Sequence, residues 1–267
     1  MKLATWNVNS LKVRLPQVLE FLAAHQPDAL CLQELKLEDS NFPIAEINAA
    51  GYQAAFSGQK TYNGVAILSP TEAADISKGI ANFDDPQKRV IAATVQGVRV
   101  ICVYIPNGEA VESDKYKYKL DWLMKLIVWL KQEMTKYPKL ALLGDYNIAP
   151  EDRDVYDPKF WTGKVLFSEP EKAAFEDMIA AGLTDSFRMF DQPEKSYSWW
   201  DYRMNGFKRN LGLRPHFAIT GTGEIVQELL HRQGHARQRA PLRPRPGDSG
   251  DLGFGEISRK ERKVHKK

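Results

Sequence analysis

The stretch LALLGDYNIAP, residues 140–150, places the strongest constraint on what this chain can fold into. Its apolar run 140–143 predicts a buried strand, and the glycine that follows is expected to allow a sharp turn. Asp145 and Asn147 then alternate, so both side chains should leave one face of the chain, with Tyr146 on the other. Open α/β sheets bind ligands at such strand ends. The alternative is an ordinary turn, because Gly, Asp and Asn dominate turns for conformational reasons alone.

Length and charge exclude several protein classes. The 267 residues suffice for one large core, and no apolar run reaches bilayer length or forms a signal sequence, so we expect a cytoplasmic protein that does not enter membranes. Cys31 and Cys102 lie in apolar runs, as reduced core thiols do. The net charge is +3, but residues from Pro215 onward carry 11 basic and 6 acidic side chains, which leaves −2 on residues 1–214. Bulk charge therefore does not indicate a nucleic-acid surface on the main body.

Strand-like and helix-like segments alternate over the first 214 residues. This alternation predicts a mixed α/β sandwich, and no repeat or linker interrupts it. We expect the strands at 3–8, 29–32, 52–56, 64–68, 90–95, 98–104 and 140–143, and the helices at 11–22, 115–136 and 169–182.

Polar side chains stand at the ends of several predicted strands, namely Asn7, Glu34, Tyr104, Asp145 and Asn147. Taken alone, Glu34 could simply open an exposed loop. Convergence of four separate parts of the chain on one sheet edge would instead suit Mg²⁺, which takes oxygen ligands from one or two carboxylates. Cys and His are absent from the set, which disfavours zinc. Such a site could hydrolyse phosphate esters, because Asp145 can orient or deprotonate water while Tyr104 and Asn147 donate hydrogen bonds.

An aromatic segment, Tyr197–Arg203, follows later in the chain. Two tryptophans and two tyrosines so close together are typical of core packing. The neighbouring basic residues Arg188, Lys208 and Arg209 equally suit aromatic side chains that stack on nucleotides. Both interpretations stay open at this point.

Six motifs in this order closely resemble the bacterial exodeoxyribonuclease III family of the endonuclease/exonuclease/phosphatase superfamily. They are ATWNVNS (4–10), LCLQE (30–34), YNGVAILS (62–69), VYIPNG (103–108), GDYNIAP (144–150) and SWWDYR (198–203). The resemblance implies a four-layered α/β sandwich over residues 1–214 and a magnesium-dependent enzyme, with Mn²⁺ as an alternative ion. It also implies a monomer that cleaves duplex DNA 5′ to abasic sites and digests strands from 3′ ends.

The resemblance also assigns roles to residues of this chain. The implied metal ligands are Asn7, Glu34, Asp145 and Asn147. Tyr104 would contact the phosphate, while Asp145 and Asn147 would position the attacking water. The implied DNA contacts are Lys60, Tyr62, Asn63, Asn107, Arg188, Trp200 and Arg203.

The resemblance stops after Arg214. There the family continues from Leu-Arg into an Ile-Asp-X-Ile-Leu strand and later ends with Ser-Asp-His-Ala-Pro, so this chain lacks the expected Asp and the Asp-His pair. Its strands that close the sheets should be missing as well, because the replacing sequence is rich in Arg, Pro and Gly. We therefore expect residues 215–267 to form an aberrant, disordered basic tail.

Reverse translation suggests how this ending arose. Read one base later, codons for Arg239–Ser249 permit Glu-Arg-Pro-Ser-Asp-His-Ala-Pro-Val-Ile-Ala, and those for Arg214–Phe217 permit Asp-His-Ile-Leu. We hypothesise an out-of-frame ending, from a frameshift or a sequencing error. The rival is a true divergent tail whose basic cluster 259–267 binds DNA phosphates. Besides an active nuclease, the chain could thus be a catalytically impaired remnant that at most binds DNA, or a sister phosphoesterase.

Overall fold

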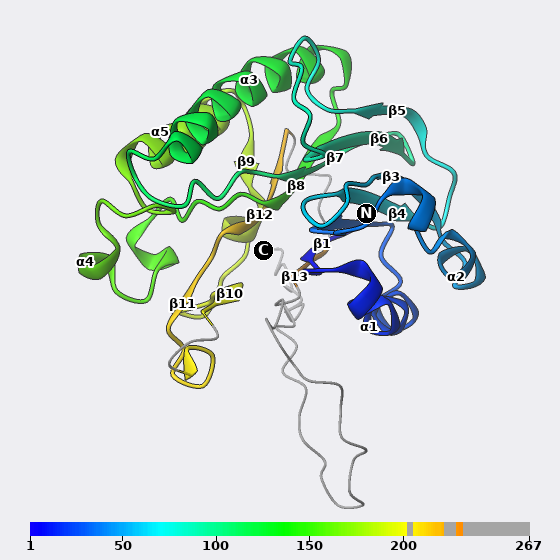
Figure 1. Ribbon diagram of the computed structural model, residues 1–267, viewed down its shortest axis with the longest axis horizontal. Coiled ribbons are helices and arrows are strands. Elements are labelled where there is room, and N and C mark those ends of the chain that lie inside the picture. Colours follow the sequence, from blue (N-terminus) through cyan, green and yellow to red (C-terminus); the bar gives the residue numbers. More distant parts are fainter. Residues whose placement is uncertain (202–204, 222–227, 232–267) are drawn as a thin grey trace, which may run out of the picture.

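The computed structural model describes residues 1–201, 205–221 and 228–231, which form two β-sheets packed face to face between helices (Figure 1). The first sheet has the order β13 (Glu228–His231), β1 (Lys2–Asn7), β2 (Ala29–Gln33), β4 (Val65–Ser69), β3 (Gln53–Ser57). The second has the order β5 (Ala74–Lys78), β6 (Val90–Val95), β7 (Val98–Tyr104), β8 (Leu140–Asp145), β12 (His216–Thr220), β9 (Thr184–Asp185). A separate hairpin pairs β10 (Trp199–Trp200) with β11 (Gly212–Leu213).

Helices cover the two outer faces (Figure 1). On the side of the first sheet lie α1 (Leu11–His25) and α2 (Ile44–Ala49), and on the side of the second lie α3 (Asp114–Lys136) and α5 (Glu169–Ala180). The remaining helical segments are α4 (Pro158–Trp161), η1 (Asp39–Asn41), η2 (Asp152–Asp154) and η3 (Ser186–Met189). The predicted four-layered α/β sandwich is confirmed. Among the described residues, no helix is both long and apolar enough to cross a membrane.

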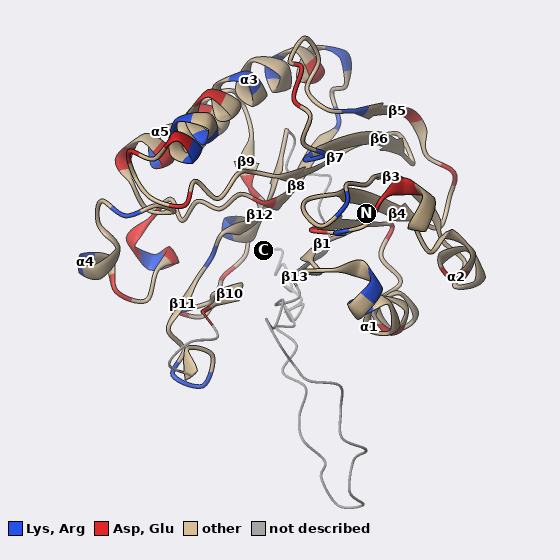
Figure 2. Ribbon diagram, in the orientation of Figure 1, with Lys and Arg blue, Asp and Glu red and all other residues tan. Residues whose placement is uncertain are grey.

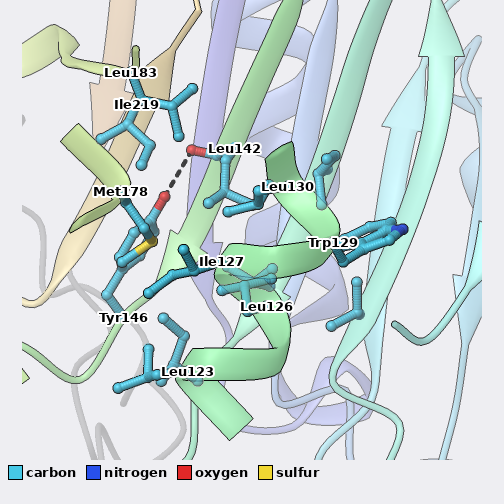
Figure 3. Packing of buried hydrophobic residues seen from close by; sticks show 14 of the residues in the cluster. Leu123, Leu126, Ile127, Trp129, Leu130, Leu142, Tyr146, Met178, Leu183 and Ile219 are labelled. Atoms are coloured by element: carbon cyan, nitrogen blue, oxygen red, sulfur yellow. Dashed lines mark hydrogen bonds between the residues drawn. The ribbon is translucent and has the colours of Figure 1, made fainter. Parts of the chain in front are cut away.

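The apolar periodicity of α3 explains how it attaches to the second sheet. Leu123, Leu126 and Leu130 recur at helical spacing, and all three are buried against the sheet (Figure 3). Tyr146 is fully buried in the same cluster, and its hydroxyl donates to the carbonyl oxygen of Leu142 at 3.0 Å. Its side chain thus points away from Asp145 and Asn147, as the alternation of residues predicts.

The glycine of the central strand has a different role from the predicted one. Gly144 lies within β8 rather than in a turn after it. A Cβ at this position would lie 2.0 Å from the carbonyl oxygen of Val103. The residue therefore permits close approach of β7 and β8, a constraint that a turn signal in the sequence does not distinguish.

The sheets continue beyond the boundary predicted at Arg214. Strand β12 pairs antiparallel with β8, with His216 opposite Asp145, and β13 pairs parallel with β1. Residues 216–220 therefore belong to the second sheet, because Phe217, Ala218 and Ile219 are apolar enough to form a buried strand. The division of the chain at Arg214 stays a prediction. The rest of the predicted tail, apart from β13 and residue 221, lies outside the described residues. Strand β5 was also not predicted, since most of its side chains are exposed.

Candidate active site

Parallel pairing brings four strand ends to one edge of the sandwich. Asn7 ends β1 opposite Gln33 of β2, and Glu34 follows at once. In the second sheet, Tyr104 ends β7 opposite Asp145 of β8. Because each pair is parallel, its two carboxyl ends lie at one edge of its own sheet. Hydrogen bonds from Asn7 to Asp145 and from Tyr104 to Glu34 join the two edges, as expected from the sequence.

Asn7 joins the two sheets through its amide group. Its Nδ2 donates to Glu34 Oε1 at 2.8 Å and to Asp145 Oδ2 at 2.9 Å, which links residues 138 positions apart. Its Oδ1 accepts from the backbone N–H of Asn9 at 3.1 Å, which fixes the orientation of the amide. The predicted convergence of Asn7, Glu34 and Asp145 is therefore present.

Glu34 accepts three different donors. Besides Asn7, the Tyr104 hydroxyl donates to Oε1 at 3.0 Å, and Lys36 Nζ lies 2.9 Å from Oε2. Burial opposes ionisation, but the hydrogen bonds from Asn7 and Lys36 outweigh it and hold the pKa of Glu34 below its usual value. Burial, together with the nearby charges of Glu34 and Asp145, raises the pKa of Tyr104 well above its usual value. Tyr104 therefore stays a protonated donor at neutral pH.

Asp145 has the opposite balance. Burial raises its pKa, and the charge of Glu34 adds to the rise, whereas His216 and the amide of Asn7 oppose it. The carboxylate is 5% exposed. Two acidic groups thus lie on one amide, and the negative charge around Asp145 is only partly compensated.

His216 is a site residue that sequence reasoning missed. Its Nε2 lies 3.7 Å from Asp145 Oδ2 and is buried without a hydrogen-bond partner in the described part of the chain, while Ser198 Oγ contacts Nδ1 at 3.1 Å. A signal for it was present in the sequence. In the Leu-Arg-Ile-Asp pattern, Leu213 and Arg214 match, so His216 stands where the pattern has Asp.

Asn147 lies beside this group and has a left-handed backbone, φ 49°. Its N–H donates to Asp145 Oδ1 at 3.1 Å, and its Nδ2 donates to the carbonyl oxygen of Ile105 at 3.0 Å. Its Oδ1 accepts from Asn107 Nδ2 at 2.9 Å. The structure therefore holds the carboxamides of Asn107 and Asn147 together at the edge of the site.

The donor set fits a hard divalent cation. Within the described ranges, no three or more His, Cys, Asp or Glu side chains are grouped as a metal cluster. Glu34 and Asp145 nevertheless supply two carboxylates around Asn7, with Lys36 as the basic partner of Glu34. One or two carboxylates with waters are sufficient for Mg²⁺.

The predicted DNA contacts have different environments. Lys60 and Tyr62 are exposed between β3 and β4, with Tyr62 at 67%. Asn63 is buried and donates to Gln59 and Gln87. Arg203 lies outside the described residues.

The aromatic segment forms a small cluster at the β10–β11 hairpin. Trp200 packs edge-on against Tyr197 and Phe207, at ring-centroid distances of 6.3 and 5.3 Å. Phe207 is 48% exposed, and Figure 2 shows basic residues on the adjoining loop. The rings pack against one another, as expected for core aromatics. Phe207 also leaves an aromatic edge exposed, as expected for side chains that stack on nucleotides, so both interpretations of the segment stay open.

A second acidic pair, Asp154 and Asp185, is neutralised by arginines. Arg214 is buried and donates from Nε to Asp154 at 2.7 Å and from a terminal nitrogen to Asp185 at 2.7 Å. Arg188 donates to Asp154 at 2.5 Å. Arg188 is therefore bound to protein carboxylates in this structure, and its predicted DNA contact stays a prediction.

Comparison with known proteins agrees with this architecture. The profile of the Endonuclease/Exonuclease/phosphatase family matches residues 4–214. Exodeoxyribonuclease III of Haemophilus influenzae is 35% identical over 227 residues, or 80% of this chain and 85% of the relative. A Neisseria protein is 51% identical with a TM-score of 0.81 over 82% of this chain and 86% of that one; its structures are described as a 3′-5′ exonuclease and as a 3′ phosphatase bound to a product DNA hairpin. An AP endonuclease from Archaeoglobus fulgidus is 37% identical with a TM-score of 0.80, covering 83% and 86%.

Proposed function

The chain belongs to the endonuclease/exonuclease/phosphatase family, and from this we propose that its site hydrolyses phosphodiester bonds in duplex DNA. We propose a DNA-repair nuclease that acts at abasic sites and removes nucleotides from 3′ ends as a monomer. The observation that carries the proposal is the link from Asn7 to both Glu34 and Asp145. It assembles carboxylates from two sheets next to a protonated phenol, which is what metal-assisted phosphate hydrolysis requires.

The proposed ligands of a divalent metal are Glu34 and Asp145, together with the amides of Asn7 and Asn147. In this structure Asn7 turns its Nδ2 toward both carboxylates, so its amide would have to turn over to offer its oxygen to the ion. We propose Mg²⁺, with Mn²⁺ as an alternative. When bound, such an ion stabilises the charge that develops on the phosphoryl oxygens.

The chain's own residues have separate proposed roles. Tyr104 would donate a hydrogen bond to a phosphate oxygen, because burial keeps its hydroxyl protonated. Asp145 would orient the attacking water and accept its proton. Asn147 would hold the water or phosphate through its carboxamide. The exposed Lys60 and Tyr62, and Asn63, Asn107, Trp200 and Arg203 would contact DNA.

A second candidate activity is removal of a 3′ phosphate from DNA. It is favoured by the 51% identity to the Neisseria protein described as a 3′ phosphatase. This activity would use the same site residues to hydrolyse a phosphate monoester. It would therefore differ from the nuclease activity only in its substrate.

The ending of the chain limits the activity that we expect. The family profile stops at residue 214, and the Asp expected after the Leu-Arg pair is absent, with His216 two residues after Arg214. We propose that the sequence after about Arg214 is out of frame and that the chain as printed is impaired. A restored chain, with its ending taken from the shifted frame of the same gene, should carry the full site.

Three labelled duplexes test the proposal, each with Mg²⁺: one with an abasic site, one with a recessed 3′ hydroxyl and one with a 3′ phosphate. We expect the restored chain to process at least the first two and the printed chain to process them poorly. Full activity of the printed chain would show that His216 and the missing groups matter less than proposed. Failure of the restored chain on all three would overturn the nuclease proposal. A gene sequence with no hidden Ser-Asp-His codons would exclude the out-of-frame ending.

A further inference from the structure

A buried lysine lies behind the site, outside the groups assigned to chemistry. Lys119 is on α3, and its side chain has no solvent exposure. Its Nζ donates to Glu171 Oε1 at 2.5 Å, to the carbonyl oxygen of Asn147 at 2.6 Å and to that of Asn107 at 3.2 Å. The ammonium group has three donors, so its hydrogen-bonding capacity is fully used.

Glu171 is held equally firmly. Its two oxygens accept from the backbone N–H groups of Leu166 and Ser168, both at 3.0 Å, and from Ser168 Oγ. Glu171 also belongs to the capping box that begins α5. The lysine is therefore anchored to a rigid acceptor between two packed helices.

The two carbonyl groups that Lys119 contacts belong to the residues whose carboxamides meet at the site. Asn107 Nδ2 donates to Asn147 Oδ1 at 2.9 Å, while Asn147 also donates its N–H to Asp145. The loops after β7 and β8 are thus joined twice, by side chains at the site and by one ammonium behind it.

We propose that Lys119 is a positioning residue that sets the distance between Asn107 and Asn147, and through them the geometry beside Asp145. Burial lowers the pKa of Lys119, and the charge of Glu171 opposes that change. A buried ion pair is weak evidence for a contribution to stability, because apolar replacement of both charges is often neutral. Positioning of two site loops is a distinct role that such a replacement would remove.

A second buried ion pair, between β7 and the same helix α3, provides a matched control. Arg99 Nε donates to Glu133 Oε2 at 2.8 Å, with exposures of 3% and 5%. Glu133 is 14 residues after Lys119, about 21 Å along α3. Arg99 contacts Asp75 and Ser77 rather than the site loops.

The test compares Lys119→Met/Glu171→Gln with Arg99→Met/Glu133→Gln in the full chain. The first readout is the side-chain amide resonances of Asn107 and Asn147 in ¹⁵N-labelled protein, beside urea unfolding. We expect these resonances to move or broaden only in the Lys119 variant. Unchanged resonances in a folded Lys119 variant, or equal changes in both variants, would overturn the proposal.

Glu171→Gln alone gives a milder variant that keeps the ammonium on both carbonyl groups. We expect this variant to leave the side-chain amide resonances of Asn107 and Asn147 unchanged. If these resonances moved or broadened, Glu171 rather than Lys119 would set the distance between the two residues. A further readout rests on the proposed function: affinity for a duplex with a stable abasic analogue should fall about tenfold in the Lys119 variant and less than about twofold in the Arg99 variant. This affinity is measured with the variants made in the restored chain. If the restored chain without these changes binds no DNA, the proposed function fails while the resonance test still decides this inference.

Discussion

Two pairs of acidic side chains in this molecule differ in how their charge is balanced. Asp154 and Asp185 share the buried Arg214, and Arg188 adds a second guanidinium. Glu34 and Asp145 instead share the neutral amide of Asn7, with Lys36 on Glu34 alone. The negative charge of the first pair is balanced by arginines of the protein, without a ligand. The second retains negative charge that a cation could satisfy, and this difference separates a structural cluster from a candidate site.

The largest expected effect on the free energy of unfolding comes from removing the arginine that Asp154 and Asp185 share. Arg214→Met leaves two buried carboxylates short of a partner, and we expect the free energy of unfolding to fall by about 3–5 kcal/mol. Urea denaturation measures this loss. Arg153→Met is the control, because that arginine is 60% exposed beside Glu151 and should matter by less than about 1 kcal/mol. Equal losses in the two variants would remove the distinction between the cluster and an ordinary surface pair.

A smaller effect on stability should follow when Mg²⁺ binds Glu34 and Asp145. Mg²⁺ at ten times its dissociation constant should add about 1.4 kcal/mol to the free energy of unfolding, because it binds only the folded site. Melting curves with and without Mg²⁺ measure this gain. It should disappear in Glu34→Gln and persist in Glu151→Gln, whose carboxylate lies outside the site. A gain that survives Glu34→Gln would place the cation elsewhere.

The smallest effect concerns the charge of Asp145 itself. Because burial raises its folded-state pKa, its ionisation costs stability as pH rises through the unfolded and then the folded pKa. Asp145→Asn should therefore raise the free energy of unfolding at pH 7. The gain should vanish below the ordinary pKa of Asp, which denaturation at several pH values can check. A loss comparable to that of Arg214→Met would mean that Asp145 is structural.

The sequence predicted most of the layers and the convergence on Asn7, Glu34 and Asp145. Periodicity is a local property, and parallel pairing makes strand ends meet, so both could be inferred without coordinates. The positions of Lys119 and Gly144 could not. A lysine on an amphipathic helix is normally solvated, and only tertiary packing shows that Lys119 contacts the carbonyl groups of two loops.

His216 was missed for another reason. The composition of its segment predicts a disordered tail, although Phe217–Ile219 alone suffice for a strand. Register with β8 then places the imidazole beside Asp145. Side-chain placement across strands depends on register, which the composition of one segment does not determine.

Incision of a duplex with one abasic site, in the presence of Mg²⁺, tests the central claim most directly. The comparison needs three proteins: the printed chain, the restored chain and the restored chain carrying Asp145→Asn. We predict cleavage by the restored chain, a loss of about 10²–10⁴-fold on Asp145→Asn, and little activity from the printed chain. A restored chain that cleaves equally well with Asn at position 145 would contradict the assignment of this site.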